Sequence, residues 1–233
     1  MADEARPLPG GWKYYLLAGM VGVVIGGGAM LAANGYLIRS YLLENPEILP
    51  EAMARLHERE AAQAVGEHRA AIERPFHSAW AGAADGDVVL VEFFDYACGF
   101  CRASNPDVER LLREDRRLKV VWREYPVLGP DSEQAAIASL AAAKAGRFKP
   151  FHDRLFATAR PTEPAVAAAR AAAGTPEAAL TDEFRTELQR NFEIARAIGA
   201  TGTPTFVIGD RVLQGAVGYD MLKAAIAKAR TKA

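Results

Sequence analysis

An apolar, strand-like run that ends directly at a Cys-x-x-Cys pair constrains this chain more than any other feature of its sequence. Residues 90–101 read Leu-Val-Glu-Phe-Phe-Asp-Tyr-Ala-Cys-Gly-Phe-Cys, and Cys98 and Cys101 are the only two cysteines. A pair between a strand and a helix places its first sulfur at the helix N-terminus, where unpaired N–H groups and the helix dipole favour the thiolate. The thiolate is the attacking species in disulfide exchange, so the sequence predicts a redox site.

Other uses of the cysteine pair fit the sequence less well. A structural zinc site takes four Cys or His ligands at characteristic spacing, and the four histidines do not have it: they are His57, His68, His77 and His152. We therefore predict no metal site. A purely structural disulfide over so short a loop removes little entropy from the unfolded chain. We expect the Cys98–Cys101 disulfide to be the only redox group, without a cofactor.

Length and charge set the class of protein. The chain has 233 residues, of which 50% are hydrophobic and 24% are charged, and its formal net charge is −1. This is enough apolar material for one full core with an additional segment. The nearly balanced charge gives no electrostatic reason to expect nucleic acid as a partner.

The N-terminal region contains a long uncharged segment at residues 14–38, after a short tail at residues 1–13. The segment is long enough to cross a bilayer as a helix. A cleavable signal peptide has a shorter apolar core and an Ala-x-Ala-like site, of which residues 29–34 offer a poor version. We predict a single uncleaved transmembrane anchor, with release after cleavage as the alternative. Because disulfides persist outside the cytoplasm, we expect the catalytic part on the periplasmic or extracytoplasmic side.

A helical stem is predicted over residues 39–74. Asn45 can cap a helix whose first turn holds Pro46. Apolar residues then share one face at helical spacing: Ile48, Leu49, Ala52, Met53 and Leu56. Such a narrow stripe fits either a spacer or a seam for homo-oligomerisation, and its periodicity does not choose between them.

The globular part is predicted over residues 75–233 and begins with a βαβ unit. Residues 88–94 are apolar except for Glu92, as in a strand that is covered on both faces. A helix is expected after Cys98, and residues 118–125 read as a second strand.

The rest of the globular part is predicted to add helices and then a hairpin. Residues 132–199 are rich in alanine and are interrupted by glycine and proline, which indicates an inserted lobe of four or five short helices. Residues 202–210 predict a strand and a turn, residues 211–213 a partner strand, and residues 219–228 a terminal helix.

Three segments together resemble the DsbA-type thiol:disulfide oxidoreductases. They are Phe-Phe-Asp-Tyr-Ala-Cys-Gly-Phe-Cys at 93–101, Pro-Val-Leu-Gly at 126–129 and Gly-Thr-Pro-Thr at 202–205. The resemblance runs from about residue 76 to the C-terminus and implies an α/β, thioredoxin-like fold with an inserted α-helical domain. Residues 42–49 of the stem further resemble the stalk of suppressor-of-copper-sensitivity C proteins, some of which form trimers through it.

The resemblance also implies roles for individual residues. Cys98 matches the exposed nucleophile and Cys101 the resolving thiol. Pro204 matches a proline that the family holds in cis, and Thr203 before it would present backbone groups to an extended substrate. The alternative is that Thr203 and Pro204 simply start a strand.

Further positions around the pair are expected to tune it. Glu92 matches a buried acidic position that could relay protons or tune the thiols, unless it is an exposed or salt-bridged strand residue. Gly99 and Phe100 stand where strongly oxidising members carry a histidine, so we expect a less oxidising pair, although backbone N–H groups alone also stabilise a thiolate. Three aromatic residues could form either an apolar substrate surface or core: Phe94, Tyr96 and Phe100.

The sequence thus predicts an enzyme of disulfide formation or exchange in secreted proteins. Its partners would be unfolded or misfolded proteins that contain cysteines, and a membrane redox protein that recycles the pair. One alternative is an oligomeric isomerase or reductase of the copper-tolerance type, built through the stem. Another is a Cu(I)-binding module that uses the two thiolates, although no further Cys or Met lies beside the pair.

Overall fold

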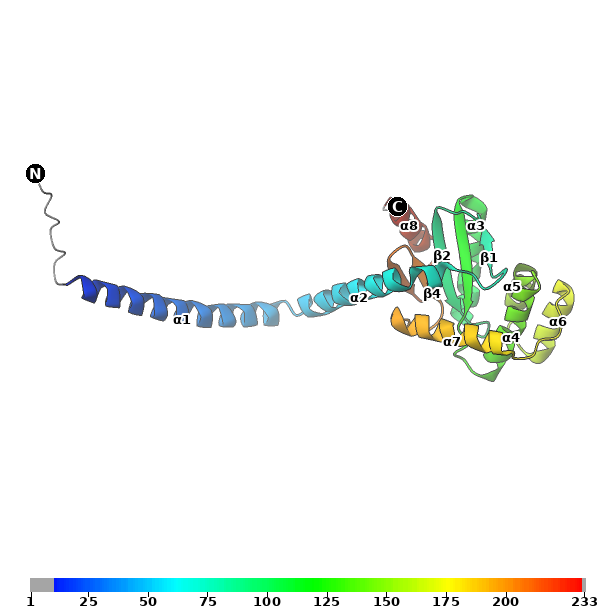
Figure 1. Cartoon of the computed structure of the whole chain (residues 1–233), viewed down its shortest axis with the longest axis horizontal. Helices are drawn as coiled ribbons and strands as arrows, with labels where there is room; N and C mark the ends of the chain where they lie inside the picture. The colour runs from blue at the N-terminus through cyan, green and yellow to red at the C-terminus, as the bar shows by residue number, and fades with distance from the viewer. Residues whose placement is uncertain (1–10, 232–233) are drawn as a thin grey trace, which may run out of the picture. The chain divides into compact units, whose positions relative to one another are not determined.

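The computed structural model describes residues 11–231, without the side chains of residues 12–13, 25–27 and 29–33. It divides the chain into two compact units, Met1–Arg55 and Leu56–Ala233. The first contains α1 (Trp12–Glu44) and the beginning of α2 (Ile48–Glu73) (Figure 1). The predicted tail at residues 1–13 lies mostly outside the described residues.

The boundary between α1 and α2 differs from the predicted cap. The side-chain amide of Asn45 donates to the carbonyl oxygen of Tyr41 at 2.8 Å, and the Asn45 backbone N–H bonds with the same oxygen. Asn45 therefore ends α1 and does not cap α2, whose first residue is Ile48. The physical reason is that the last carbonyl groups of α1 lack helical partners, and the amide supplies one.

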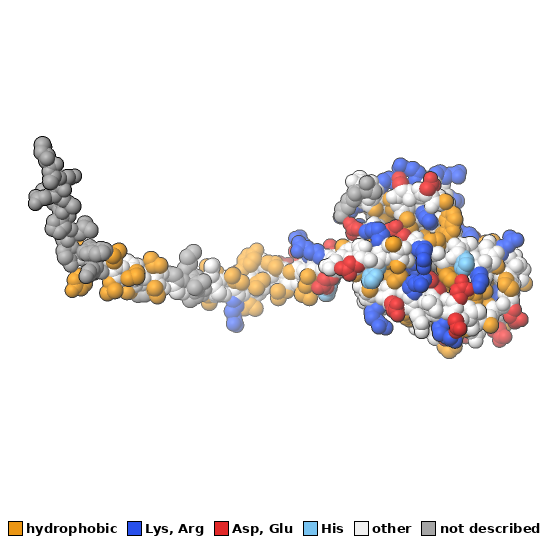
Figure 2. Space-filling view, viewed as in Figure 1, with side chains coloured by type: hydrophobic (Ala, Val, Ile, Leu, Met, Phe, Trp, Pro, Cys, Tyr) orange, Lys and Arg blue, Asp and Glu red, His pale blue; other side chains and the backbone are white. Residues whose placement is uncertain are grey.

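Hydrophobic side chains cover the described part of α1 (Figure 2). The large ones that are exposed in the first unit before Asn45 are Tyr14, Tyr15, Leu16, Leu17, Met20, Val21, Val23, Val24, Tyr36, Leu37, Ile38, Tyr41 and Leu43. Among the described residues, no helix has the length and apolar character needed to cross a membrane. The predicted anchor at 14–38 includes side chains outside the described part, and it stays a prediction.

The second unit is built on a five-stranded sheet in the order β1-β3-β2-β4-β5. Its strands are β1 (Trp80–Gly82), β2 (Val88–Phe94), β3 (Leu118–Glu124), β4 (Thr205–Ile208) and β5 (Arg211–Gln214). The parallel strands β2 and β3 are joined by α3 (Gly99–Glu114), and the other pairs are antiparallel. This confirms the predicted βαβ unit, hairpin and thioredoxin-like α/β fold. Strand β1 was not predicted, because three residues carry no periodic pattern.

Helices fill the interval between β3 and β4. They are α4 (Pro130–Lys144), α5 (Phe148–Phe156), α6 (Glu163–Ala173) and α7 (Asp182–Ala197), and α8 (Tyr219–Arg230) follows β5. These four helices before β4 occupy the region of the predicted insertion at about 132–199, and the first of them begins at Pro130. Its helices α4, α5 and α6 lie together beside the sheet (Figure 1).

The sheet is buried on both faces, as expected for β2. One face contributes to the main core with α3, α8 and the insertion, through Leu90, Phe94, Val120, Trp122 and Phe206. The alternate residues of the strands pack with α2 and α7, through Val65, Ile72, Val91, Phe93, Val121, Ile194, Ile198 and Val207. A strand alternates its side chains between two faces, so a nearly continuous apolar run serves both cores.

Part of the predicted stem belongs to the compact second unit. Arg123 on β3 is 3% exposed, and its guanidinium ties the end of α2 to α7. Its acceptors are the carbonyl oxygens of Ala71, Ile72 and Arg74 and the side chains of Glu187 and Asn191. The second unit therefore begins at Leu56, within α2 and before the sequence-based boundary at residue 75.

Candidate active site

The cysteine pair lies where β2 gives way to α3. Cys98 is the N-cap residue of α3, with φ −76° and ψ 117°, and Cys101 lies in its first turn. Both are free thiols; Cys98 is 5% exposed and Cys101 is fully buried. The first sulfur thus stands at the helix N-terminus that the sequence predicted.

The surroundings of Cys98 favour its thiolate. A hydrogen bond from the Cys101 side chain is the largest influence, and it helps to lower the pKa of Cys98 to about 5. A hydrogen bond with the Thr203 side chain and those from the backbone N–H groups of Cys101 and Phe100 act in the same direction, while burial opposes them. A thiol with this pKa is ionised at neutral pH and is therefore ready to react.

The environment of Cys101 has the opposite effect. Burial raises the pKa of this thiol far above its usual value, with further contributions from its hydrogen bond to Cys98 and from the charge of Glu92. One cysteine is thus held as a thiolate while the other stays protonated. The two sulfurs therefore differ in their readiness to react.

The segment before β4 lies against Cys98. The peptide bond between Thr203 and Pro204 is cis, as the resemblance implies. In the thiol form, Cys98 donates to the carbonyl oxygen of Thr203 at 3.2 Å. Pro204 is buried and Thr203 is half-buried. The fold therefore brings these three predicted site residues together.

Glu92 lies in the sheet behind the pair and is 2% exposed. The indole N–H of Trp122 donates to its carboxylate at 3.1 Å. Burial raises the pKa of Glu92 to about 8, and the charge of Cys98 adds to this, while the Trp122 hydrogen bond opposes it. The structure thus excludes the alternative of an exposed residue and leaves an acid that is largely protonated near neutral pH.

The aromatic residues near the pair separate into core and surface. Phe94 and Tyr96 are buried, so they belong to the core and do not form a substrate surface. The Tyr96 hydroxyl lies within hydrogen-bond distance of Ser139 and of His152 Nδ1. Phe100 is 68% exposed and Gly99 is exposed beside it. Of the three aromatic side chains, Phe100 alone is available to a substrate.

The sequence motifs contained Asp95 without revealing its task. Its buried carboxylate accepts hydrogen bonds from the backbone N–H groups of Ala97, Val127 and Leu128. The one sequence feature that could have drawn attention to Asp95 is its charge, which stands between an apolar strand and the cysteine pair. No spacing rule indicates that this residue reaches a loop more than thirty positions away.

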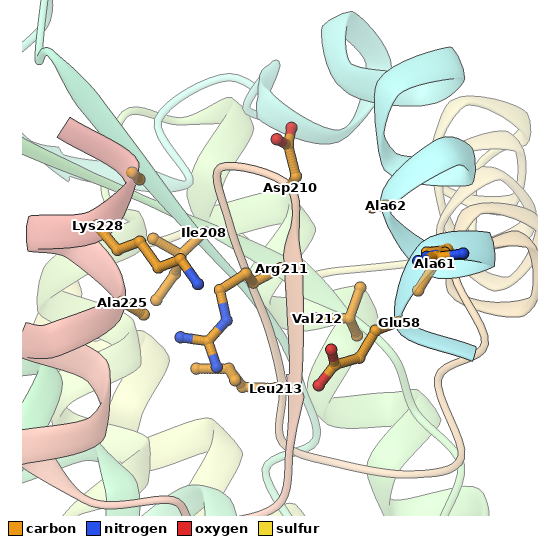
Figure 3. A pocket seen from close by; sticks show the side chains of 12 residues that line it. Glu58, Ala61, Ala62, Ile208, Asp210, Arg211, Val212, Leu213, Ala225 and Lys228 are labelled. Atoms are coloured by element: carbon orange, nitrogen blue, oxygen red, sulfur yellow. The ribbon is translucent and has the colours of Figure 1, made fainter. Parts of the chain in front are cut away.

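A separate hollow of about 280 Å³ lies among α2, β5 and α8 (Figure 3). Arg211 and Lys228 extend into the same space on one side of β5, and Glu58 lies on the other side. Neither cysteine lines this hollow. In the described part of the chain, no three His, Cys, Asp or Glu side chains are placed to hold a metal ion.

Comparisons with known proteins agree with this geometry. Residues 89–227 match the family model of the DSBA-like thioredoxin domain, and residues 35–63 match that of the copper resistance protein ScsC N-terminal domain. Proteus mirabilis ScsC, solved in a transitional conformation, is 33% identical with a TM-score of 0.69; the match covers 84% of this chain and 93% of that one.

Curated relatives are similar to this chain over part of its length. Disulfide bond formation protein D of Bacillus subtilis is 27% identical over 165 residues, which are 63% of this chain and 74% of the relative. Na(+)/H(+) antiporter NhaA 3 of Salinispora tropica is 30% identical over 159 residues, which are 64% of this chain. The chain spans 24% of the length of that antiporter, so the likeness concerns one part of it.

Proposed function

The chain belongs to the DSBA-like thioredoxin domain family, and from this premise we propose that it is an extracytoplasmic thiol:disulfide oxidoreductase acting through Cys98 and Cys101. The observation that carries the proposal is the contrast between the two thiols. The pKa of Cys98 is lowered to about 5 at the start of α3, whereas burial raises that of Cys101. A purely structural pair has no need of such a contrast.

Oxidation of a substrate dithiol follows one route. A substrate thiolate attacks the Cys98 sulfur of the Cys98–Cys101 disulfide, a mixed disulfide forms, and the electron pair of the broken bond passes to Cys101. A second substrate thiolate attacks the substrate sulfur of the mixed disulfide, and Cys98 leaves as a thiolate. The substrate gives up two electrons and two protons, and the cysteine pair is left reduced.

The buried side of the site fits the proton movements of this route. Because its pKa is raised, Cys101 takes up a proton as its sulfur leaves the disulfide. Glu92 is the acid whose charge acts on both thiols, and its pKa of about 8 lets it hold that proton near neutral pH. Cys98 needs no proton to leave, because its pKa is about 5. Glu92 therefore serves as a proton relay in this proposal.

The proposed direction is oxidation of secreted proteins. A pair whose reduced form is stabilised is a stronger oxidant, and an ionised Cys98 stabilises the reduced form. The sequence predicts a less oxidising pair because Gly99 and Phe100 replace a histidine that would stabilise the thiolate. In this proposal, hydrogen bonds from the Cys101 thiol and from backbone N–H groups stabilise the Cys98 thiolate instead. A membrane redox protein would then reoxidise the pair.

Equilibration of the full chain with glutathione tests the direction. A reduction potential near about −120 mV is expected for a disulfide donor. A value of about −180 mV or lower would reject the oxidase direction and favour isomerase or reductase work. Loss of cycling in Cys98→Ser, with wild-type cycling intact, is the control that assigns the signal to this pair.

The stem supports one alternative, an oligomeric isomerase. Residues 35–63 match the ScsC N-terminal domain model, and three apolar residues of the predicted stripe are exposed: Leu49, Met53 and Leu56. Several active sites joined by a stem could act together on one misfolded protein. Refolding of a protein with scrambled disulfides tests this alternative. If the chain is an oligomeric isomerase, the rate at which it refolds this substrate should fall when the oligomer is dissociated.

The membrane anchor at residues 14–38 is part of the proposal. It follows from the uncharged sequence of this segment and from the extracytoplasmic setting that disulfide chemistry requires. Carbonate extraction of membranes tests it: the full chain should stay in the pellet, and a chain lacking residues 14–38 should not enter it. Recovery of a shortened chain in the soluble fraction would favour cleavage and release.

A further inference from the structure

The Asp95 carboxylate joins two separate segments of the site. Asp95 follows β2 and is 1% exposed. One oxygen accepts from the Ala97 N–H at 2.8 Å, in the turn that carries Cys98. The other accepts from the N–H groups of Val127 at 2.9 Å and Leu128 at 3.1 Å, in the loop after β3. A single side chain therefore holds the nucleophile's turn and this loop together.

The hydrogen bonds between Asp95 and the loop lie just beyond the point where the pairing of β2 with β3 ends. The parallel register of β2 and β3 stops at Phe94 and Glu124, and the Tyr125 N–H still bonds with the Phe94 carbonyl at 2.8 Å. Beyond that point the N–H groups of the loop bond with the Asp95 side chain. A carboxylate suits this task because it accepts at both oxygens and forms stronger hydrogen bonds than a neutral acceptor.

The loop shows its apolar side chains to solvent while its N–H groups point inward. Val127 is 40% exposed and Leu128 is 55% exposed. Pro126 precedes them, and Gly129, with φ 111°, leads into Pro130 at the start of α4. Prolines and a required positive φ restrict the backbone of so short a segment. The exposed side chains are thus presented by a restrained loop.

We propose that Asp95 is a positioning residue that holds Val127 and Leu128 beside Cys98 as a recognition surface for an apolar residue of the substrate polypeptide. The inference rests on the proposed function and adds a substrate preference to it: extended segments with an apolar residue near the reacting cysteine. Phe100, two residues after Cys98 and 68% exposed, offers a further apolar side chain near the reacting sulfur. Asp95 acts through the loop and does not touch the substrate.

Asp95→Asn tests the role of the carboxylate. The amide has one oxygen, so it can accept hydrogen bonds either from Ala97 or from the loop. Its NH₂ group would then point at N–H groups that also donate, and those hydrogen bonds would be lost. We measure kcat/KM of the full chain for a reduced, unfolded two-cysteine protein, and in parallel the rate constant with glutathione. The variant should lose about tenfold in kcat/KM for the protein, chiefly through KM, and lose much less in the glutathione rate.

A second variant tests the surface without touching the carboxylate. Leu128→Ser should lower kcat/KM for the protein substrate by about tenfold and leave the glutathione rate unchanged. Leu180→Ser is the matched control, because Leu180 is 38% exposed next to α7, whose Glu183 pairs with Lys144 at the opposite end of α4 from the loop. This control should change neither rate.

The outcomes separate this inference from the function on which it rests. A wild-type chain that exchanges disulfides with neither substrate rejects the proposed function. If the wild type is active, an unchanged protein rate in Leu128→Ser rejects the recognition surface alone. An equal loss of both rates in Asp95→Asn shows that Asp95 acts on Cys98 itself and overturns its assignment as a positioning residue for the loop.

Discussion

The sulfur of Cys98 lies 3.2 Å from the carbonyl oxygen of Thr203, although 105 positions separate the two residues in the sequence. This contact places the proposed nucleophile against the cis peptide bond between Thr203 and Pro204. A polypeptide that reacts with the Cys98 sulfur must therefore also come near the backbone groups of Thr203 and Pro204. The cysteine pair and the Thr203–Pro204 segment, which is predicted to meet the substrate, therefore form one site.

The ionisation of Cys98 can be measured directly. Because neighbouring hydrogen bonds lower the pKa of Cys98 to about 5, its alkylation rate in the reduced chain should rise with pH and level off above about pH 6. Iodoacetamide labelling followed by mass spectrometry gives the midpoint. Cys98→Ser should abolish the labelling, since Cys101 is buried. A midpoint above pH 8 would contradict the asymmetry of the pair.

Glu92 should make stability depend on pH. Burial raises its pKa from 4.5 to about 8, so the unfolded chain releases this proton more easily than the folded chain. The stabilising effect of the protonated form is complete below about pH 4.5 and is lost as pH rises toward 8.

Glu92→Gln removes this titration. The variant should gain a few kcal/mol of unfolding free energy relative to the wild type at alkaline pH, and little at acidic pH, as measured by urea denaturation. Its disulfide exchange should also slow, by roughly a hundredfold, where Cys101 must be protonated. Glu133→Gln, at an exposed carboxyl on α4, is the control. Equal stability changes at both pH values would argue against a raised pKa.

Arg123 should anchor the end of α2 to the catalytic unit. Its guanidinium bonds with three carbonyl oxygens of residues 71–74 and with Glu187 and Asn191. Arg123→Ala should destabilise the second unit by about 3–5 kcal/mol, because Glu187 and the carbonyl groups lose a buried partner. Hydrogen exchange should rise first in the last turns of α2. The control is Arg116→Ala at an exposed position, which should change neither the stability of the second unit nor the hydrogen exchange of α2.

The apolar stripe at the start of α2 should join copies of the chain. The side chains of Leu49, Met53 and Leu56 are 55%, 50% and 46% exposed. Covering such apolar side chains with a partner helix is energetically favourable. We expect an oligomer in sedimentation of the full chain, and a monomer after Leu49→Glu combined with Met53→Glu. A wild-type monomer would remove the basis for the stem-built isomerase.

Local patterns were sufficient for much of the fold. The apolar run at residues 88–94, the cysteine pair at a helix start and the hairpin near residue 210 are short-range features, and all appear in the structure. Strand β1 escaped prediction because it depends on pairing with β3. The cap at Asn45 was wrong for a different reason: its contact with Tyr41 is local, but an Asn side chain can serve the end of one helix or the start of the next.

Local sequence patterns were enough to place the cysteine pair between a strand and a helix, because strand and helix signals act over a few residues. It did not determine how Cys98 meets Thr203, how Asp95 reaches Val127, or how Trp122 covers Glu92. These contacts join residues far apart in the chain, and only packing decides which of them meet. The helix start already favours Cys98 as the thiolate, but burial also sets a pKa, so only the tertiary structure explains why Cys101 stays protonated.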